Sequence, residues 1–183
     1  MVSTLKSIAV YCGHQMGTDP QFKRDAAAVG RMLAKNGIRM VFGGGDVGLM
    51  GTVATACLKN GGEVIGVSTN DVIAMQEPAH TGIEVQIVDG VNKRKQLMFD
   101  ESDAFIILPG GIGTLNEVTD ILTMQQIGET NKPVFFLNSN GFWNPLARLV
   151  KHMKKFGFMV KFDVYNMQSA DTVTELKKQI LKY

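Results

Sequence analysis

Length, composition and charge limit the kinds of protein that this sequence can encode. The chain has 183 residues, 45% of them hydrophobic and 20% charged, which is enough for one sizeable core and predicts a single domain over residues 1–183. Its formal net charge of +2 is too balanced for a nucleic-acid-binding surface or a polybasic membrane patch, and no apolar run approaches the roughly 18 residues of a membrane span. We therefore expect neither a nucleic acid nor a membrane as partner.

The cysteine content favours a reducing compartment. Two cysteines, Cys12 and Cys57, occur in a chain without a basic-then-apolar secretory leader. We expect both thiols to be buried and the protein to be cytoplasmic. No spacing of His, Cys and acidic residues is typical of a zinc site, so we expect no bound metal.

Short apolar or β-branched segments alternate with longer segments of helical spacing. This alternation predicts βαβ units and therefore a Rossmann-like, doubly wound α/β fold, with a mainly parallel sheet flanked by helices. In chain order, strands are expected at residues 7–11, 39–42, 64–67, 84–88, 104–108 and 134–137. Helices are expected at residues 20–36, 49–58, 92–101, 114–126, 142–156 and 172–181, with a loop at 68–82.

Three glycine-containing loops follow predicted strands. They are Cys12-Gly13-His14, Gly43-Gly44-Gly45 and the segment 109–114. Ligands of parallel sheets bind outside the carboxyl ends of the strands, where loops pass into helix N-termini. We expect the three loops to line one crevice, with the backbone of Gly43, Gly44 and Gly45 and the side chain of His14 at the ligand.

The second loop also matches a dinucleotide-binding pattern. Gly43, Gly45 and Gly48 have the spacing G-x-G-x-x-G, a weak fingerprint that is equally compatible with a tight strand-to-helix turn. The next predicted strand ends in Val67-Ser68-Thr69-Asn70, without the acidic residue that would hold a ribose, and no G-K-[ST] occurs. The sequence therefore argues against NAD and ATP as ligands.

The third loop leads into the spacing T-x-x-E, from Thr114 to Glu117. One interpretation is a capping box, in which the glutamate bonds back to the first amides of the helix. However, Pro109 and three glycines precede it, which is more than a cap requires. In the second interpretation, Glu117 faces whatever occupies the crevice.

Three cations, Lys93-Arg94-Lys95, open the helix predicted at 92–101. A positive charge at a helix N-terminus is unfavourable by up to about 1 kcal/mol, so an anion would compensate it. Arg94 is the better candidate because its planar guanidinium can clamp a phosphate or carboxylate. Lys93 is equally well explained as part of a solvated basic face.

The segment 109–117 reads P-G-G-I-G-T-L-N-E and matches the motif P-G-G-x-G-T-x-x-E in all its fixed positions. With the Arg94-Lys95 pair and G-G-G-D-V-G-L-M-G at 43–51, it makes the chain resemble the LONELY GUY type phosphoribohydrolases, long labelled lysine decarboxylases. The resemblance covers most of residues 7–160. No lysine has a motif that would support a pyridoxal-phosphate Schiff base.

The resemblance implies a homodimer without a cofactor that hydrolyses the N-glycosidic bond of purine nucleoside 5′-monophosphates, AMP or cytokinin nucleotides. The products are the free base and ribose 5-phosphate. It implies that Arg94 and Glu117 form the catalytic pair. The implied ligand contacts are Gly110, Gly111, Ile112, Gly113, Thr114, Leu115 and Asn116 in the glycine motif, Lys95 beside Arg94, Thr123 on the helix after the motif, and Glu77 in the segment E-P-A-H at 77–80. Met98 is a further candidate for contact with the base.

The chemistry of the residues agrees with this reaction. Breaking a ribosyl C–N bond builds positive charge on the sugar. An ionised carboxylate at Glu117 would either stabilise this charge or activate the attacking water. Arg94 would orient the phosphate, the carboxylate or both. Relatives of the same fold bind molybdenum cofactor, so a non-catalytic binding protein is the alternative.

Three departures from the family pattern concern the ligand. His14 replaces a hydroxyl residue after the first strand, Lys93 replaces an acid, and Met124 stands where a tryptophan is common. A fourth departure, Ser68-Thr69 with the divergent loop that follows, leaves the preferred base open.

Overall fold

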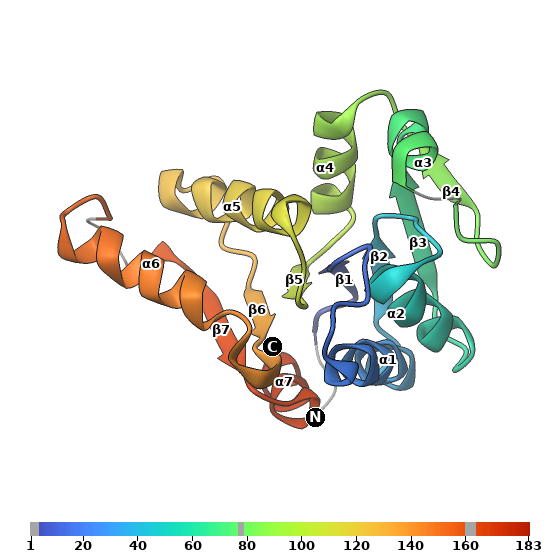
Figure 1. The fold of residues 1–183 in the computed structure, drawn as a ribbon, viewed down its shortest axis with the longest axis horizontal. Helices are drawn as coiled ribbons and strands as arrows, with labels where there is room; N and C mark the ends of the chain where they lie inside the picture. Colours follow the sequence, from blue (N-terminus) through green and yellow to red (C-terminus); the bar gives the residue numbers. More distant parts are fainter. Residues whose placement is uncertain (1–3, 77–78, 160–163) are drawn as a thin grey trace.

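A seven-stranded, entirely parallel sheet forms the centre of the molecule (Figure 1). The computed structural model describes residues 4–76, 79–159 and 164–183. In this part of the chain the strand order is β4-β3-β2-β1-β5-β6-β7. The strands are β1 Ser7–Tyr11, β2 Arg39–Phe42, β3 Val64–Ser68, β4 Val85–Ile87, β5 Ala104–Ile107, β6 Val134–Leu137 and β7 Met167–Ala170. The predicted α/β, Rossmann-like fold is confirmed, and every strand pair described is parallel.

Helices connect the strands. They are α1 Pro20–Lys35, α2 Gly48–Leu58, α3 Asn70–Gln76, α4 Val91–Asp100, α5 Ile112–Ile127, α6 Asn144–Lys155 and α7 Val173–Ile180, with a short 3₁₀ helix, η1, at Ser139–Gly141. All of them except α3 and the 3₁₀ helix begin and end close to the predicted positions. The start of α1 shows the local cause. The Asp19 carboxylate accepts a hydrogen bond of 2.8 Å from the Gln21 N–H, and Pro20 occupies the first turn. None of the described helices is long and apolar enough to cross a membrane.

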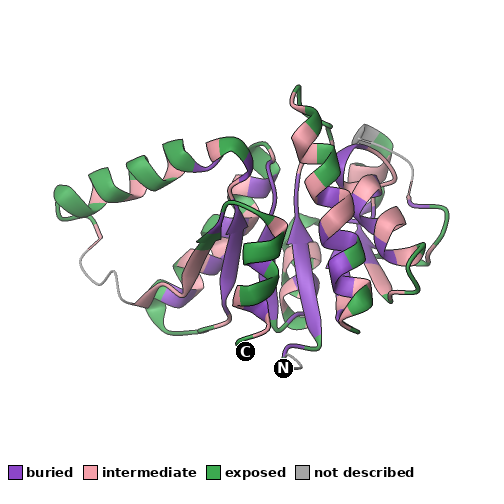
Figure 2. Cartoon of the chain, turned by 90° about the horizontal axis from the view of Figure 1, so that it is seen from below, coloured by how far each residue is buried: buried purple, intermediate pink, exposed green. Residues whose placement is uncertain are grey.

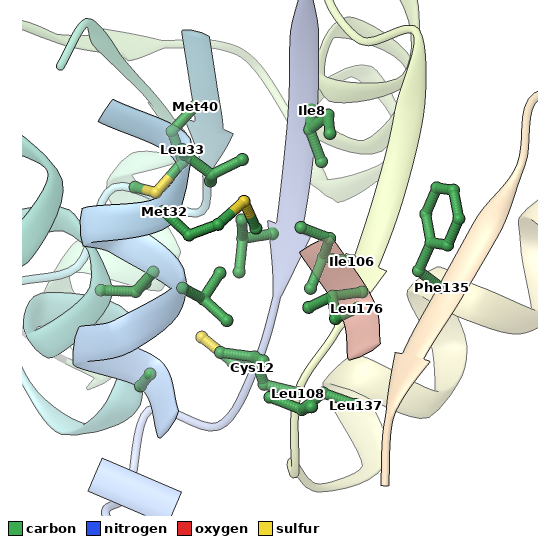
Figure 3. Packing of buried hydrophobic residues seen from close by; sticks show 14 of the residues in the cluster. Ile8, Cys12, Met32, Leu33, Met40, Ile106, Leu108, Phe135, Leu137 and Leu176 are labelled. Atoms are coloured by element: carbon green, nitrogen blue, oxygen red, sulfur yellow. The ribbon is translucent and has the colours of Figure 1, made fainter. Parts of the chain in front are cut away.

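Both faces of the sheet are buried under helices. Helices α1, α2 and α7 pack on one face, where Met32 and Leu33 meet Ile8 and Ile106 of the strands (Figure 3). Helices α4 and α5 cover the other face, where Met98 and Val118 belong to a second cluster. The strands at the centre are accordingly buried along their length (Figure 2). This double covering explains why the strands read as continuous apolar runs rather than alternating ones.

The strand order reverses between β1 and β5, and this position is where open α/β sheets bind ligands. The carboxyl ends of the two strands are in register, with Tyr11 beside Ile107. Just beyond them, the Gly13 N–H donates a 3.0 Å hydrogen bond to the Pro109 carbonyl. The loops after β1 and β5 therefore meet, and the loop after β2 lies on the adjacent strand.

Two predictions of secondary structure were wrong. The segment predicted as a loop at 68–82 contains α3, whose start is capped by the Thr69 hydroxyl accepting from the Val72 N–H at 3.1 Å. Strand β7 was missed because its sequence, M-Q-S-A, contains no β-branched residue and forms the edge of the sheet, where burial is incomplete.

Candidate active site

Arg94 of α4 and Glu117 of α5 form an ion pair at the carboxyl ends of the central strands. Arg94 Nη1 lies 3.5 Å from Glu117 Oε1, and the two side chains are only 11% and 12% exposed. The guanidinium also donates from Nε to the Val67 carbonyl at 3.0 Å and from Nη2 to the Gly43 carbonyl at 3.4 Å. Because an unpaired buried charge is costly, these three partners fix the guanidinium in one orientation.

Two glycines make this arrangement sterically possible. A Cβ atom at Gly43 would overlap Arg94 Nη2, so only glycine lets the guanidinium reach the end of β2. A Cβ atom at Gly110 would overlap the Thr114 hydroxyl and lie 3.0 Å from the Gly13 nitrogen. Gly43 therefore lets the Arg94 side chain approach the backbone at the end of β2. Gly110 lets the loop after β5 approach the loop after β1.

Glu117 does not cap α5. The N-cap is Gly111, no side chain caps the helix, and the first intrahelical bond runs from the Leu115 N–H to the Gly111 carbonyl at 3.0 Å. Thr114 lies inside the first turn and is 3% exposed. The capping-box interpretation is therefore wrong, because the glycine motif starts the helix three residues earlier. The carboxylate is left to pair with Arg94, and the first turn of α5 has no side-chain cap, as at helix starts that bind anions.

Burial changes the protonation of Glu117. Desolvation raises its pKa from 4.5 to about 7, although the charges of Arg94 and Lys95 lower it, and Asp120 raises it further. The ionised carboxylate expected from the sequence is therefore only one of two forms of this side chain near neutral pH. Near pH 7 the protonated and ionised forms are both populated. Such a group can accept a proton at neutral pH, which suits a general base.

A groove of about 380 Å³ runs between α4 and α5 and has Glu117 in its wall. Tyr11 at the end of β1 also lines it and stacks on Phe105 at 5.8 Å between ring centroids. Burial and the Glu117 charge raise the pKa of Tyr11 far above its ordinary value, so its hydroxyl stays protonated. The remaining lining residues include Asn92, Lys95, Gln96, Phe99, Asp120, Ile121, Thr123, Met124, Ile127 and Glu129. The lining thus combines aromatic and aliphatic side chains with the acids Glu117, Asp120 and Glu129.

Lys95 is held on α5 rather than left free. Its Nζ donates to Asn116 Oδ1 at 3.0 Å and to Asp120 Oδ2 at 2.5 Å. Lys95 and Thr123 therefore line the groove, and Asn116 is joined to it through its hydrogen bond with Lys95. Sequence reasoning missed Asp120 and Tyr11; the spacing of three residues from Glu117 to Asp120 on one helix would have indicated the first.

His14 lies between two of the glycine loops. It lines one hollow with Gly43, Gly44 and Gly45, and a second of about 210 Å³ with Gly13, Pro109, Gly110 and Gly111. The imidazole is half-buried. The loop after β1 therefore meets the loop after β2 in one hollow and the loop after β5 in the other, rather than all three lining one crevice, and the His14 side chain lies near the N-terminus of α5.

Other candidate residues are not at the ligand crevice or are not described. Met98 is fully buried in the core beneath α4, so it is a packing residue and the predicted contact with the base is wrong. Lys93 is 70% exposed and pairs with Asp89 at 3.4 Å, as a solvated face would. Glu77 lies outside the described residues. The Ile112 side chain is 81% exposed and the Leu115 side chain packs against the core. Within the described ranges, no three His, Cys, Asp or Glu side chains are grouped as metal ligands would be.

Comparison with known proteins identifies the family. Residues 50–180 match the family described as "Possible lysine decarboxylase". The cytokinin riboside 5′-monophosphate phosphoribohydrolase of Rhodococcoides fascians is 41% identical over 157 residues, covering 85% of this chain and 79% of the relative. Its counterpart LOG1 of Arabidopsis thaliana is 36% identical over 181 residues, covering 99% and 85%.

A solved structure supports the fold independently. The molybdenum cofactor binding protein of Rippkaea orientalis superposes with a TM-score of 0.69, at 23% identity over 97% of each chain. That likeness is one of fold. The family match and the two relatives together show that the chain belongs to the family of cytokinin riboside 5′-monophosphate phosphoribohydrolases.

Proposed function

We propose that this protein is a phosphoribohydrolase that cleaves the N-glycosidic bond of purine nucleoside 5′-monophosphates, with AMP and cytokinin nucleotides as the substrate class. The observation that carries the proposal is the buried Arg94–Glu117 pair beside the N-terminus of α5. A carboxylate next to an anion-binding helix start is what a reaction on a phosphorylated sugar requires.

The order of groups along α5 suggests how the nucleotide lies. The phosphate would bind the N–H groups of Ile112, Gly113 and Thr114 and the His14 side chain. The ribose would then reach Glu117, one turn further along the helix. The base would enter the groove between α4 and α5, where Tyr11, Phe99 and Met124 offer apolar surface. This groove is large enough for a purine and is aliphatic at its Ile127 side, which suits an N6 substituent.

In the proposed reaction, water replaces the base at C1′ of the ribose. The C1′–N bond breaks, its electron pair leaves with the base, and the water oxygen bonds to C1′. The Glu117 carboxylate takes the water proton and stabilises the positive charge that develops on the sugar, and the departing base takes up a proton. Arg94 contacts the carboxylate, so its proposed role is to orient Glu117 and to keep part of the population ionised.

The raised pKa of Glu117 predicts how kcat depends on pH. Because the ionised form of Glu117 is the active one, kcat is expected to rise with pH around a midpoint near 7, the pKa that burial imposes on this carboxyl. An ordinary glutamate would place the midpoint near 4.5. Steady-state rates from pH 5 to 9 measure it. A kcat that falls through pH 7 would instead show that protonated Glu117 is the active species.

Product analysis tests the reaction itself. The purified protein is incubated separately with AMP and with isopentenyladenosine monophosphate, and the products are separated by chromatography. We expect free base and ribose 5-phosphate in equal amounts, with the ratio of rates ranking the two substrates. A folded protein that binds a phosphorylated pterin and releases no base from either nucleotide would favour the carrier alternative.

We further propose that the protein is a homodimer, because α6 is loosely packed within one copy, with Leu146 partly buried against the core. None of its residues, all of which the structure describes, is buried (Figure 2), and Leu149 and the adjacent Phe156 are 52% and 60% exposed. An apolar hollow of about 200 Å³, lined by Leu146, Trp143 and others, lies beside it. Light scattering after size exclusion should give about 40 kDa, twice the chain mass of 20.0 kDa. A mass of one chain at all concentrations would refute the dimer.

We place the protein in the cytoplasm. Cys12 and Cys57 are both free and buried, a state that a reducing compartment preserves.

A further inference from the structure

His80 is a buried histidine in the segment that follows α3. Only 6% of it is exposed. Its backbone N–H donates to the Gly44 carbonyl at 2.9 Å, and the preceding Ala79 forms an antiparallel bridge with Gly45. The segment containing His80 is therefore paired, backbone to backbone, with the glycine loop that follows β2.

The His80 imidazole uses both of its nitrogens. Nδ1 accepts a hydrogen bond from the Gly82 N–H at 3.0 Å, so the neutral ring carries its proton on Nε2. Nε2 lies 3.1 Å from the Thr55 hydroxyl on α2 and 3.4 Å from Asp46 Oδ1 in the glycine loop. The ring edge also packs on Phe42 at the end of β2. One side chain thus links its own turn, the glycine loop and α2.

The glycine loop in turn holds Arg94. The Gly43 carbonyl accepts from Arg94 Nη2, and the Cα of Gly43 lies so close to the guanidinium that no Cβ would fit between them. A shift of this loop would therefore move the guanidinium and change its approach to Glu117. Among the residues that the structure describes, His80 joins the loop through its backbone to Gly44 and through its side chain to Asp46.

We propose that His80 is a positioning residue for the Arg94–Glu117 pair, acting through its Nε2 contacts with Asp46 and Thr55. The proposal rests on the proposed function, in which Arg94 orients Glu117. His80 is buried and does not line the hollows that face the glycine loops or the α4–α5 groove, so it acts on kcat rather than on substrate binding. The contact between Nδ1 and the Gly82 N–H, by contrast, stabilises only the turn that contains His80.

Two substitutions separate the contacts of the ring. In His80→Gln the side-chain amide nitrogen occupies the place of Nε2 and still donates to Thr55 or Asp46, whereas the Gly82 contact is lost. In His80→Asn the amide oxygen occupies the place of Nδ1 and still accepts from Gly82, whereas the contacts with Thr55 and Asp46 are lost. Both variants keep a polar group in the pocket, and thermal melting verifies that each is folded.

The proposal predicts opposite outcomes for the two variants. His80→Gln should retain kcat within about 3-fold, and His80→Asn should lose about 10- to 100-fold in kcat with little change in KM, as expected for a displaced catalytic group. Equal kcat values in the two variants, or a loss confined to His80→Gln, would overturn the positioning role. Thr55→Val, which removes one Nε2 partner from α2 and leaves His80 in place, should lose kcat in the same direction. A wild-type kcat in that variant would count against the proposal even if His80→Asn did not fold.

The pKa of Glu117 can be measured without substrate turnover, so it tests the role of His80 separately from the proposed reaction. Because the Arg94 charge lowers the pKa of Glu117, withdrawing the guanidinium should raise that pKa in His80→Asn and leave it unchanged in His80→Gln. Carboxyl ¹³C NMR titration reports it in either variant, whether or not the protein hydrolyses a nucleotide. A wild type that is inactive would refute the proposed function, and identical Glu117 titrations in all three proteins would refute the role of His80.

Discussion

Glu117→Gln is expected to lower kcat by about 10²- to 10⁴-fold, the usual contribution of a positioned general base, while the protein remains folded. The amide is nearly isosteric with the carboxyl group, and Arg94 keeps its hydrogen bonds to the Val67 and Gly43 carbonyls. The amide can neither take a proton from water nor balance a positive charge on the ribose. Rates of base release under saturating AMP measure the effect. Unchanged turnover would remove Glu117 from the mechanism.

The same substitution should stabilise the fold at alkaline pH. Burial raises the pKa of Glu117 to about 7, from 4.5, so the folded state resists ionisation more than the unfolded state does. The stability due to protonated Glu117 is therefore complete below pH 4.5 and is lost as the pH rises through 7. At pH 8 the buried charge costs about 3 kcal/mol, at 1.36 kcal/mol per pKa unit, and the neutral glutamine avoids much of this cost.

Urea unfolding at two pH values tests this stability effect. The free energy of unfolding of Glu117→Gln should exceed that of the wild type at pH 8 and equal it near pH 4. Asp89→Asn is the control, since this carboxylate is 96% exposed, is paired with Lys93 and does not contribute to the pKa of Glu117. It should keep most of the turnover. If Glu117→Gln is less stable than the wild type at pH 8, the ion pair with Arg94 stabilises the fold by more than the burial of the Glu117 charge destabilises it.

The position of the site could be predicted from the sequence because it follows from topology. Alternating strands and helices imply parallel strands, and the carboxyl ends of parallel strands lie at one edge of the sheet. Three glycine loops at strand ends therefore had to meet, and the contact between Gly13 and Pro109 and the place of His14 agree with this. Nothing more than residue type and chain order was needed.

The roles of individual side chains could not be predicted in the same way. The spacing T-x-x-E is the same in a capping box and in this site, and only the true start of α5 at Gly111 distinguishes them. The pKa of Glu117 depends on burial by elements far apart in the chain, which no local pattern reports. Met98 was a candidate for contact with the base, but it lies on the side of α4 that packs on the core. The contacts of His80 with Thr55 and Asp46 likewise join distant segments.

Arg94→Gln should lower kcat by about 10²- to 10³-fold, as expected when one preorganised electrostatic partner of a reacting group is removed. Lys93→Gln is the matched control because it removes the same charge from the adjacent position of α4, at a side chain that is 70% exposed. That variant should remain within about 2-fold of the wild type, since surface charges away from a site have small effects. Equal losses in the two variants would indicate a general effect of charge on nucleotide binding.

The pH profile of Arg94→Gln identifies what the guanidinium does. The Arg94 charge lowers the pKa of Glu117, so its removal should move the midpoint of the kcat profile above 7 and leave the carboxyl protonated over more of the neutral range. Activity should then recover partly at pH 9, where Glu117 ionises without its partner. If Arg94 served the substrate phosphate instead, KM would rise and the midpoint would stay near 7. The 3.5 Å contact between Nη1 and Oε1 favours the first result, because it gives the guanidinium a partner within the protein before any nucleotide binds.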